Sequence, residues 1–462
     1  MYSINQNKGS IQQQITKLSN KSDSGSFFNL LTNDNLFDKL EEQLPEHRER
    51  EFPPTETLSM FLSQMVNPDS SCQKAVNDAA FKRLISGFKN ISLATGGYCK
   101  ARQRIPLEMI STLAKYSAEL INKKIPSKWK FNNREVKIID GTTVSMPDTK
   151  ANQKEFPQSL SQKAGLGFPV SRIVGITSLS SGVLLDAAIG PCKGKGTGEQ
   201  DLLRQISSSF NEGDIVLGDA YFGTYFFLAE LLLKKVDGVF EQMGSRKKSC
   251  DFTRGKKLGQ KDHIVTLNKP KKKPQWMSVE DYKSAPDTLK IRELKVSGKL
   301  LITTFLSKKE MPKKKLKEFY KSRWHIELDI RNIKTTMGMA EFKCKTPSMV
   351  IKEMWVYLLA YNLIRMLMVQ AAISANIAPR KISFKHTMQL WLIFNQYQLN
   401  VNNQEMMNKF FLLIASKTVG NRSGRIEPRA VKRRHNNMPR LMKQRHIARE
   451  EIRKNGHPKK LK

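Results

Sequence analysis

A change of hydrophobic period near residue 130 is the feature that most constrains the fold of this chain. Residues 1–130 carry apolar side chains at three- and four-residue intervals, in Leu36 to Leu44, Thr55 to Met65 and Gln73 to Phe88. This spacing predicts amphipathic helices. Beyond it begin short apolar runs typical of strands, the first being Val136 to Asp140. The chain is therefore expected to combine a helical region with an α/β region.

The α/β region alternates strands with helices after an opening hairpin. The predicted hairpin joins Val170 to Ile176 with Gly182 to Ile189 through a turn at Ser180 and Ser181. The elements expected next are a helix, a strand, a helix and a strand: Gln200 to Phe210, Asp214 to Asp219, Phe222 to Lys235 and Gly238 to Phe240. This order predicts an α/β fold with a sheet of mixed direction and flanking helices.

Composition and period divide the chain further. From Gly244 to Trp276 no regular period is visible, and this segment holds 11 basic and 2 acidic residues, whereas Ile291 to Phe305 alternates like strands. We expect a helical N-terminal DNA-binding region, a core in two pieces, a basic β-rich insertion, a helical C-terminal region and a basic tail. The predicted boundaries are 1–130, 131–243 with 306–345, 244–305, 346–422 and 423–462.

The charge balance points to a polyanionic partner. Lysine and arginine number 79 against 42 acidic residues, a formal net charge of +37. The 39% hydrophobic content supports a folded protein rather than a disordered basic one. Nucleic acid is the first expectation, with acidic proteins and anionic membranes as alternatives.

Cysteine and histidine spacing argues against a zinc ribbon or a disulfide framework. The five cysteines are scattered without a Cys-x-x-Cys pair, and the seven histidines include no pair at metal-ligand spacing. Any metal is therefore expected to be held by carboxylates.

No membrane association is expected. The first residues lack the apolar stretch of a secretory signal, which predicts a cytoplasmic protein associated with the nucleoid. The apolar run from Met354 to Ala372 contains Asn362, Arg365 and Gln370. Because a central arginine is costly in a bilayer, we expect a buried core helix there.

Two acids stand at the carboxyl ends of predicted buried strands. Asp140 ends one strand and Asp219 ends another. Ligands of open α/β sheets bind at this edge, and a charge there is costly unless it meets a cation. A helix cap or a turn former is an equally good interpretation of either acid alone.

A third acid lies on the helix expected to follow Pro312. Tyr320, Arg323, Glu327 and Lys334 fall within one arc of about 60° at 100° per residue. The alternative is a solvated stripe of salt bridges. Much of the rest of the helix is apolar, which favours a polar stripe pressed against something specific.

These residues resemble the signature of DDE transposases of bacterial insertion sequences, in the group marked by Tyr-x2-Arg-x3-Glu-x6-Lys. Tyr320, Arg323, Glu327 and Lys334 match that spacing without a gap. Further similar segments are DGTTVSMPDT at 140–149, GDAYFGTYFFLAEL at 218–231, KTPSMVIKEMW, YNLIR, TLSMFLSQ, GGYCKARQRIP and EPRAVKRR. The resemblance covers most of the chain beyond about residue 50.

The resemblance implies a ribonuclease-H-like core in which Asp140, Asp219 and Glu327 are catalytic and bind two divalent ions. In-line phosphodiester chemistry requires an activated water or 3′-hydroxyl and a stabilised leaving oxygen, which a pair of metal ions supplies. Oxygen ligands suit Mg²⁺ or Mn²⁺.

The same resemblance assigns DNA contacts. Arg323 and Lys334 are expected to hold phosphate, and Tyr320 to donate a hydrogen bond or stack. Arg102 and Arg104 are candidate phosphate or base contacts, with plain surface charge as the alternative. The basic run from Arg246 to Lys273 is interpreted as a DNA-tracking surface rather than a solvated loop.

Other acids and the glycine-rich segment receive plainer interpretations. Asp148, Asp186 and Glu199 are expected at the surface or in caps. His325 and Asp329 lie off the polar face and are expected in packing or salt bridges. The segment KGKGTGEQDLL at 193–203 lacks the ending of a P-loop and is interpreted as a turn leading into a helix.

The expected function is that of a metal-dependent DNA transposase. It would bind terminal inverted repeats, cleave the element ends and join the 3′-hydroxyl to target DNA, acting as a homodimer on double-stranded DNA. The alternatives are a ribonuclease-H-like nuclease without strand transfer and an inactive relative that acts as a DNA-binding repressor.

Overall fold

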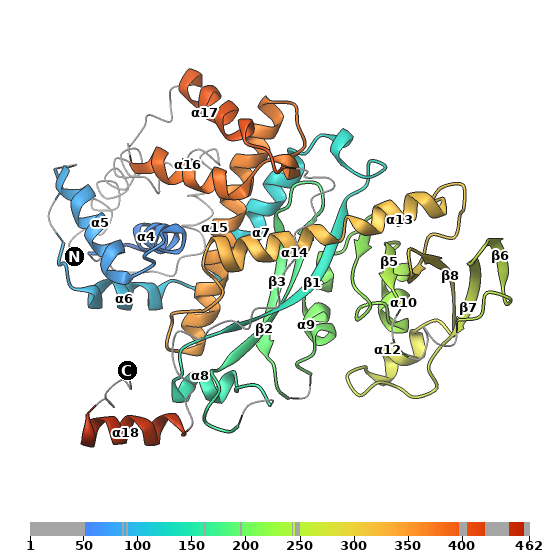
Figure 1. The fold of residues 1–462 in the computed structure, drawn as a ribbon, viewed down its shortest axis with the longest axis horizontal. Coiled ribbons are helices and arrows are strands. Elements are labelled where there is room, and N and C mark those ends of the chain that lie inside the picture. Colours follow the sequence, from blue (N-terminus) through green and yellow to red (C-terminus); the bar gives the residue numbers. More distant parts are fainter. Residues whose placement is uncertain are drawn as a thin grey trace, which may run out of the picture.

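The computed structural model describes residues 51–85, 87–88, 91–160, 163–194, 196–242, 244, 250–396, 404–420 and 443–456. A long mixed sheet runs through the molecule, with helices packed against it and a helical lobe beside one end (Figure 1). The predicted helix Leu36 to Leu44 and most of the basic tail lie outside the described residues.

The helical lobe combines helices from before and after the sheet (Figure 1). Its N-terminal helices are α4 (Pro54–Val66), α5 (Cys72–Ile85), α6 (Thr95–Arg104) and α7 (Leu107–Lys123). Its C-terminal helices are α15 (Pro347–Ser374), α16 (Phe384–Gln396) and α17 (Gln404–Ser416). Apolar residues of α4, α7 and α15 share one buried cluster, so the helices before and after the sheet are joined by a common core.

Helix α15 is the core helix that the sequence predicts. By length and composition it is the one helix among the described residues able to cross a membrane, but 89% of its apolar window is buried inside the protein. Its Asn362 side chain donates to the carbonyls of Ala114 and Leu184, at 3.0 and 2.9 Å, and accepts from the Leu184 amide at 2.8 Å. The polar group is thus satisfied by helix α7 and an edge strand rather than by lipid or water.

The sheet has the strand order β3-β2-β1-β4-β5-β9-β8-β7-β6. Its first half comprises β1 (Val136–Ser145), β2 (Val170–Ser178), β3 (Leu184–Pro191), β4 (Ile215–Leu217) and β5 (Asp237–Glu241). Strand β2 is antiparallel to β1 and β3, whereas β1, β4 and β5 are mutually parallel. This is the ribonuclease-H-like arrangement, and the predicted mixed α/β fold is confirmed.

Short helices complete the connections of this half. Helices α9 (Glu199–Gln205) and α10 (Tyr225–Leu233) follow β3 and β4 and pack on the sheet through a second apolar cluster. The remaining short helices are α8 (Lys150–Glu155), η1 (Ser127–Trp129), η2 (Ser207–Ser209) and η4 (Pro379–Lys381).

The segment after β5 extends the same sheet. It comprises β6 (Lys256–Gly259), β7 (Asp262–Asn268), α12 (Val279–Ser284), β8 (Thr288–Val296) and β9 (Lys299–Thr303), with β9 antiparallel to β5. Strands β6 and β7 lie where the sequence shows no regular period. The lysines of β6 are exposed on the last strand of the sheet, and charged edge strands of this kind carry little hydrophobic alternation.

The helix predicted from Pro312 to about Met337 is divided into three. Helix α13 (Lys313–Lys321) is followed by a turn at Ser322 and Arg323, then by α14 (Trp324–Arg331) and a π-helical turn, η3 (Asn332–Thr336). Trp324 is 59% exposed, so it does not belong to the apolar face expected for this helix. The last described helix is α18 (Arg445–Asn455).

Candidate active site

Asp140 lies within β1 and not at its end as predicted, because β1 continues to Ser145 against β2, whereas Asp219 follows the end of β4. Strand register nevertheless brings both acids to the same end of the β1–β4 pair. Parallel strands β1 and β4 pair Ile138 with Leu217. Asp140 and Asp219 each lie two residues beyond that pair along the chain. The buried residues before them anchor both strands in the core, whereas the two acids are only partly buried. Two segments separated by almost 80 residues therefore deliver carboxylates to one place.

Helix α14 adds the third carboxylate through one arginine. The Arg323 guanidinium lies 2.7 Å from Oε1 of Glu327 and 3.7 Å from Oδ2 of Asp140. The three side chains are 14%, 34% and 18% exposed, respectively. Of the three predicted catalytic acids, Asp140 and Glu327 thus lie beside the same largely buried guanidinium group, that of Arg323.

Asp219 is oriented by its own turn and by Tyr320. Its Oδ1 accepts from the Tyr221 amide at 2.9 Å, and the Tyr320 hydroxyl donates to the carbonyl of Gly218 at 3.2 Å. A Cβ at Gly218 would lie 2.9 Å from the side chain of Ile139, so this close approach requires glycine. Tyr320 is 6% exposed, and burial raises its pKa. The phenol is hydrogen-bonded to the backbone beside Asp219, and its expected contact with DNA stays a prediction.

The site is short of positive charge. Burial raises the pKa of Asp140 to about 6, the Gly141 amide and Arg323 oppose this rise, and the charges of Asp219 and Glu199 add to it. One guanidinium shared by two carboxylates does not compensate the whole group. Carboxylates gathered in this way are typical of sites that bind a cation or take part in catalysis.

Glu199, expected at the surface or in a cap, is a fourth carboxylate beside this site. It opens α9, and a Cβ on Gly141 would lie 2.5 Å from its carboxyl carbon, so its side chain covers the backbone next to Asp140. Burial raises the Glu199 pKa, Arg172 lowers it and Asp219 raises it. Acids are common in the first turn of a helix because the helix dipole favours them, so the sequence position of Glu199 did not indicate that Asp140 lies nearby.

Lys334 completes the polar stripe on the helix. Its Nζ donates to the Thr143 carbonyl at 2.7 Å and to Oγ1 of Thr142 at 3.2 Å, and burial lowers its pKa. The ammonium is therefore held against β1 just beyond Asp140. Tyr320, Arg323 and Lys334 thus contact β1 or the turn after β4, and Glu327 is linked to this region through Arg323.

The two arginines predicted in α6 differ sharply. Arg102 is 8% exposed, its guanidinium lies over the rings of Phe61 and Tyr98 at 4.8 and 5.0 Å, and it donates to Sγ of Cys72 at 3.2 Å. A DNA contact is inconsistent with this burial, because packing inside the lobe already uses the side chain. Arg104 is exposed, and its DNA contact stays a prediction.

Most secondary acids occupy structural positions. Asp329 is fully buried against Arg365 and Arg380, the salt-bridging role expected for it. Asp186 is buried within β3 rather than at the surface or in a cap as expected, and it pairs with Lys115 at 2.9 Å. Asp148 is partly buried and lies 3.5 Å from Arg445. Desolvation lowers the pKa of the half-buried His325 to about 4, and Arg380 adds to this effect, in line with the expected packing role.

The donor set fits a divalent cation. Carboxylate oxygens are the ligands that Mg²⁺ and Mn²⁺ prefer. Asp140 and Glu327 meet at Arg323, and Asp219 follows the strand that pairs with β1. No sulfur or imidazole ligand approaches this group among the described residues. Like-charged groups gathered in this way repel each other without a cation.

Fold and site together define a ribonuclease-H-like protein with a carboxylate site at the edge of β1 and β4. A family model described as "Transposase DDE domain" matches residues 132–363, half of the chain, and the chain belongs to this family. Enzymes of this family generally depend on divalent metal ions.

Two individual proteins are similar to the chain. Transposase InsG for insertion sequence element IS4, of Escherichia coli (strain K12), is 28% identical over 284 residues, which are 61% of this chain and 62% of the relative. The chain thus spans about three fifths of that curated relative. A piggyBac transposase in a synaptic complex with hairpin DNA, solved by cryo-EM, shares 9% identity over 85% of each chain, with a TM-score of 0.44.

Proposed function

We propose that this protein is the DNA transposase of a bacterial insertion sequence, binding the terminal inverted repeats, cleaving the element ends and joining the 3′-hydroxyl to target DNA. The observation that carries the proposal is the meeting of Asp140 and Glu327 at Arg323 beside the turn of Asp219. Membership of the transposase family and the similarity to InsG support it.

In this proposal Asp140, Asp219 and Glu327 hold two Mg²⁺ or Mn²⁺ ions. The ions supply activation of the attacking water or 3′-hydroxyl and stabilisation of the leaving oxygen. Arg323 lies between Asp140 and Glu327, and its guanidinium group would bind a DNA phosphate beside these carboxylates. Tyr320 positions the Gly218–Asp219 turn through its hydrogen bond to the Gly218 carbonyl.

Glu199 enters the proposal as a further acid of the site. Its carboxyl group lies over Gly141, between Asp140 and Arg172. A carboxylate there strengthens the attraction for cations and orients the ligands that touch them. We assign Glu199 a positioning role because no contact with Asp219 or Glu327 is seen.

The net charge of +37 supports double-stranded DNA as the partner. Lys334, Arg323 and the exposed Arg104 are proposed phosphate contacts at the transposon end. We further propose that the chain acts on nucleoid DNA as a homodimer, since two ends must be brought together for joining.

The test uses a labelled duplex carrying the terminal inverted repeat found beside the coding region. With Mg²⁺ the purified protein is expected to nick the duplex at the repeat and then to form a joined product with a second DNA. Specific cleavage without joining, in Mg²⁺ as well as in Mn²⁺, would instead indicate a nuclease that does not transfer strands. Binding without cleavage, even in Mn²⁺, would replace it by a repressor.

A further inference from the structure

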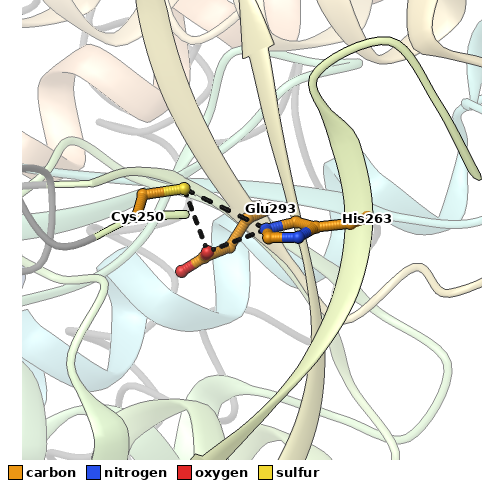
Figure 2. Close-up of side chains that lie close together, drawn as sticks. All are labelled: Cys250, His263 and Glu293. Atoms are coloured by element: carbon orange, nitrogen blue, oxygen red, sulfur yellow. Dashed lines mark hydrogen bonds and ion pairs between the residues drawn. The ribbon is translucent and has the colours of Figure 1, made fainter. Parts of the chain in front are cut away.

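A second cluster of metal-ligand side chains lies in the strands after β5, away from the carboxylate site. Strands β7 and β8 pair His263 directly with Glu293, so both side chains leave the same face of the sheet. Cys250, from the segment before β6, approaches them from the side (Figure 2). Oε2 of Glu293 lies 3.2 Å from both the Cys250 Sγ and the His263 Nε2, and Sγ lies 4.0 Å from Nε2.

The hydrogen-bonding chemistry of His263 calls for a cation in this cluster. Its Nδ1 lies 2.7 Å from the Arg254 carbonyl, which only accepts, so Nδ1 carries the proton of a neutral ring. The Nε2 lone pair then faces a carboxylate oxygen of Glu293 at 3.2 Å. Two acceptors in contact at 1% and 4% exposure require a positive group between them, either a second ring proton or a metal ion.

The geometry does not match a cysteine nucleophile. In a Cys–His–acid triad the acid binds the ring nitrogen that faces away from the nucleophile. Here thiol and carboxylate both face Nε2 of His263, and the backbone occupies Nδ1. Convergence of three ligands on one point is instead the arrangement of a metal centre, with a backbone carbonyl fixing the histidine tautomer.

We propose that Cys250, His263 and Glu293 bind one zinc ion that fastens the segment at Cys250 to strands β7 and β8. Sulfur, nitrogen and oxygen donors 3.2–4.0 Å apart suit a tetrahedral ion with bonds of about 2.0–2.3 Å. A thiolate ligand selects zinc over Mg²⁺. Gln242 donates to the other carboxylate oxygen of Glu293, Oε1, at 3.1 Å and thereby connects the centre to the end of β5. The expectation that any metal would be held by carboxylates therefore omits this centre.

Two substitutions separate a zinc centre from a hydrogen-bonded cluster. Cys250→Ser keeps a hydroxyl donor, and Glu293→Gln offers an amide donor to the histidine ring, so both preserve hydrogen bonding but weaken zinc binding. Cys99→Ser, at a cysteine in α6, is the matched control. The readouts are zinc per chain by mass spectrometry, zinc affinity by titration calorimetry, and the thiolate-to-metal absorption band after Co²⁺ substitution.

The full chain is expected to bind one zinc ion and to show the Co²⁺–thiolate band. Cys250→Ser abolishes the band, and both cluster variants bind zinc at least tenfold more weakly than Cys99→Ser does. A strong chelator lowers the melting temperature of the wild type but not of Cys250→Ser. Zinc content and affinity that are unchanged in both variants, or a wild type that binds no zinc when titrated under reducing conditions, would overturn the proposal.

Discussion

Helix α14 carries two acids, Glu327 and Asp329, that differ in burial and in the positive charge around them. Asp329 is fully buried and is met by two guanidinium groups, those of Arg365 and Arg380. Glu327 is 34% exposed and shares the single guanidinium of Arg323 with Asp140. The same helix therefore holds one carboxylate that is amply neutralised and one that is not.

The difference separates a structural charge from a functional one. The two partners of a fully buried ion pair depend on each other for stability. Removing one of them leaves the other charge uncompensated in a core of low dielectric constant. A half-exposed carboxylate with too little positive charge around it keeps capacity for an external cation. Burial and counter-ion number, rather than residue type, distinguish the two roles on α14.

The largest expected effect concerns Glu327→Gln. Loss of a carboxylate proposed to bind metal should lower cleavage of the end duplex by about 10³-fold or more, because transition-state stabilisation by the ions is lost. Melting temperature and binding to the end should change little. Glu318→Gln, on the neighbouring helix α13, is the control and should cleave normally. Loss of end binding would instead assign Glu327 a structural role.

Asp329→Asn should act on stability. Removing its charge leaves two arginines without their partner, and the free energy of unfolding should fall by about 3–5 kcal/mol. Urea denaturation measures the change, and cleavage per folded molecule should stay close to wild type. Glu341→Gln breaks a pair that is 55% and 56% exposed and should cost under about 1 kcal/mol. Equal stability of the two variants would refute the contrast between buried and exposed charge.

Glu199→Gln should lie between these extremes. A carboxylate that orients the ligands, without being one of them, is expected to matter about 10- to 100-fold in metal affinity or cleavage. The rate should be measured over a range of Mg²⁺ concentrations, with Glu212→Gln, an exposed acid, as the control. A rate identical to the control at every Mg²⁺ concentration would remove Glu199 from the site.

The metal-free protein should lose stability as the pH rises. The pKa of Asp140 is raised from 3.8 to about 6 in the folded state, so the folded chain binds more protons between these values. Its contribution is favourable below pH 4 and is lost by about pH 6, a change of roughly 2–3 kcal/mol. Unfolding of wild type and Asp140→Asn in chelator from pH 4 to 7 should show the steeper decline in wild type. Parallel curves would argue against a raised pKa.

The smallest expected effect is that of Lys334→Ala. Loss of one phosphate contact should weaken binding to the end and reduce the slope of log affinity against log salt by about 1. Lys409→Ala, on α17, serves as the control because its side chain is 75% exposed and pairs with Glu405. A salt slope equal to that of the control would place Lys334 in a purely structural role against Thr142 and Thr143.

Local pattern was sufficient for several elements. The apolar strand before Asp140, the hairpin after Val170 and the core helix α15 follow from hydrophobic period, and the structure confirms them. The resemblance to DDE transposases is confirmed by the family model. Strand β6 was missed because its exposed lysines conceal the alternation that marks a strand, and β7 was missed with it because it lies in the same lysine-rich segment.

The sequence pattern could not predict the surroundings of individual side chains. Arg102 and Arg104 are two residues apart in the same basic segment, yet one packs inside the lobe and the other is exposed. Glu199 looked like a helix cap until α9 was seen against Gly141. Cys250 and Glu293 are 43 residues apart, and their contact depends on how strand β8 pairs with β7.

By itself the sequence determined which residue types were available for chemistry and on which local elements they stand, because helix and strand periods are written in neighbouring residues. Only the tertiary structure decided which charges meet. The register of β1 with β4 gathers Asp140 and Asp219, and the packing of α14 brings Asp140 to the local Arg323–Glu327 pair and two distant arginines to Asp329. Electrostatic role depends on distance and burial in three dimensions, and neither quantity is local in the chain.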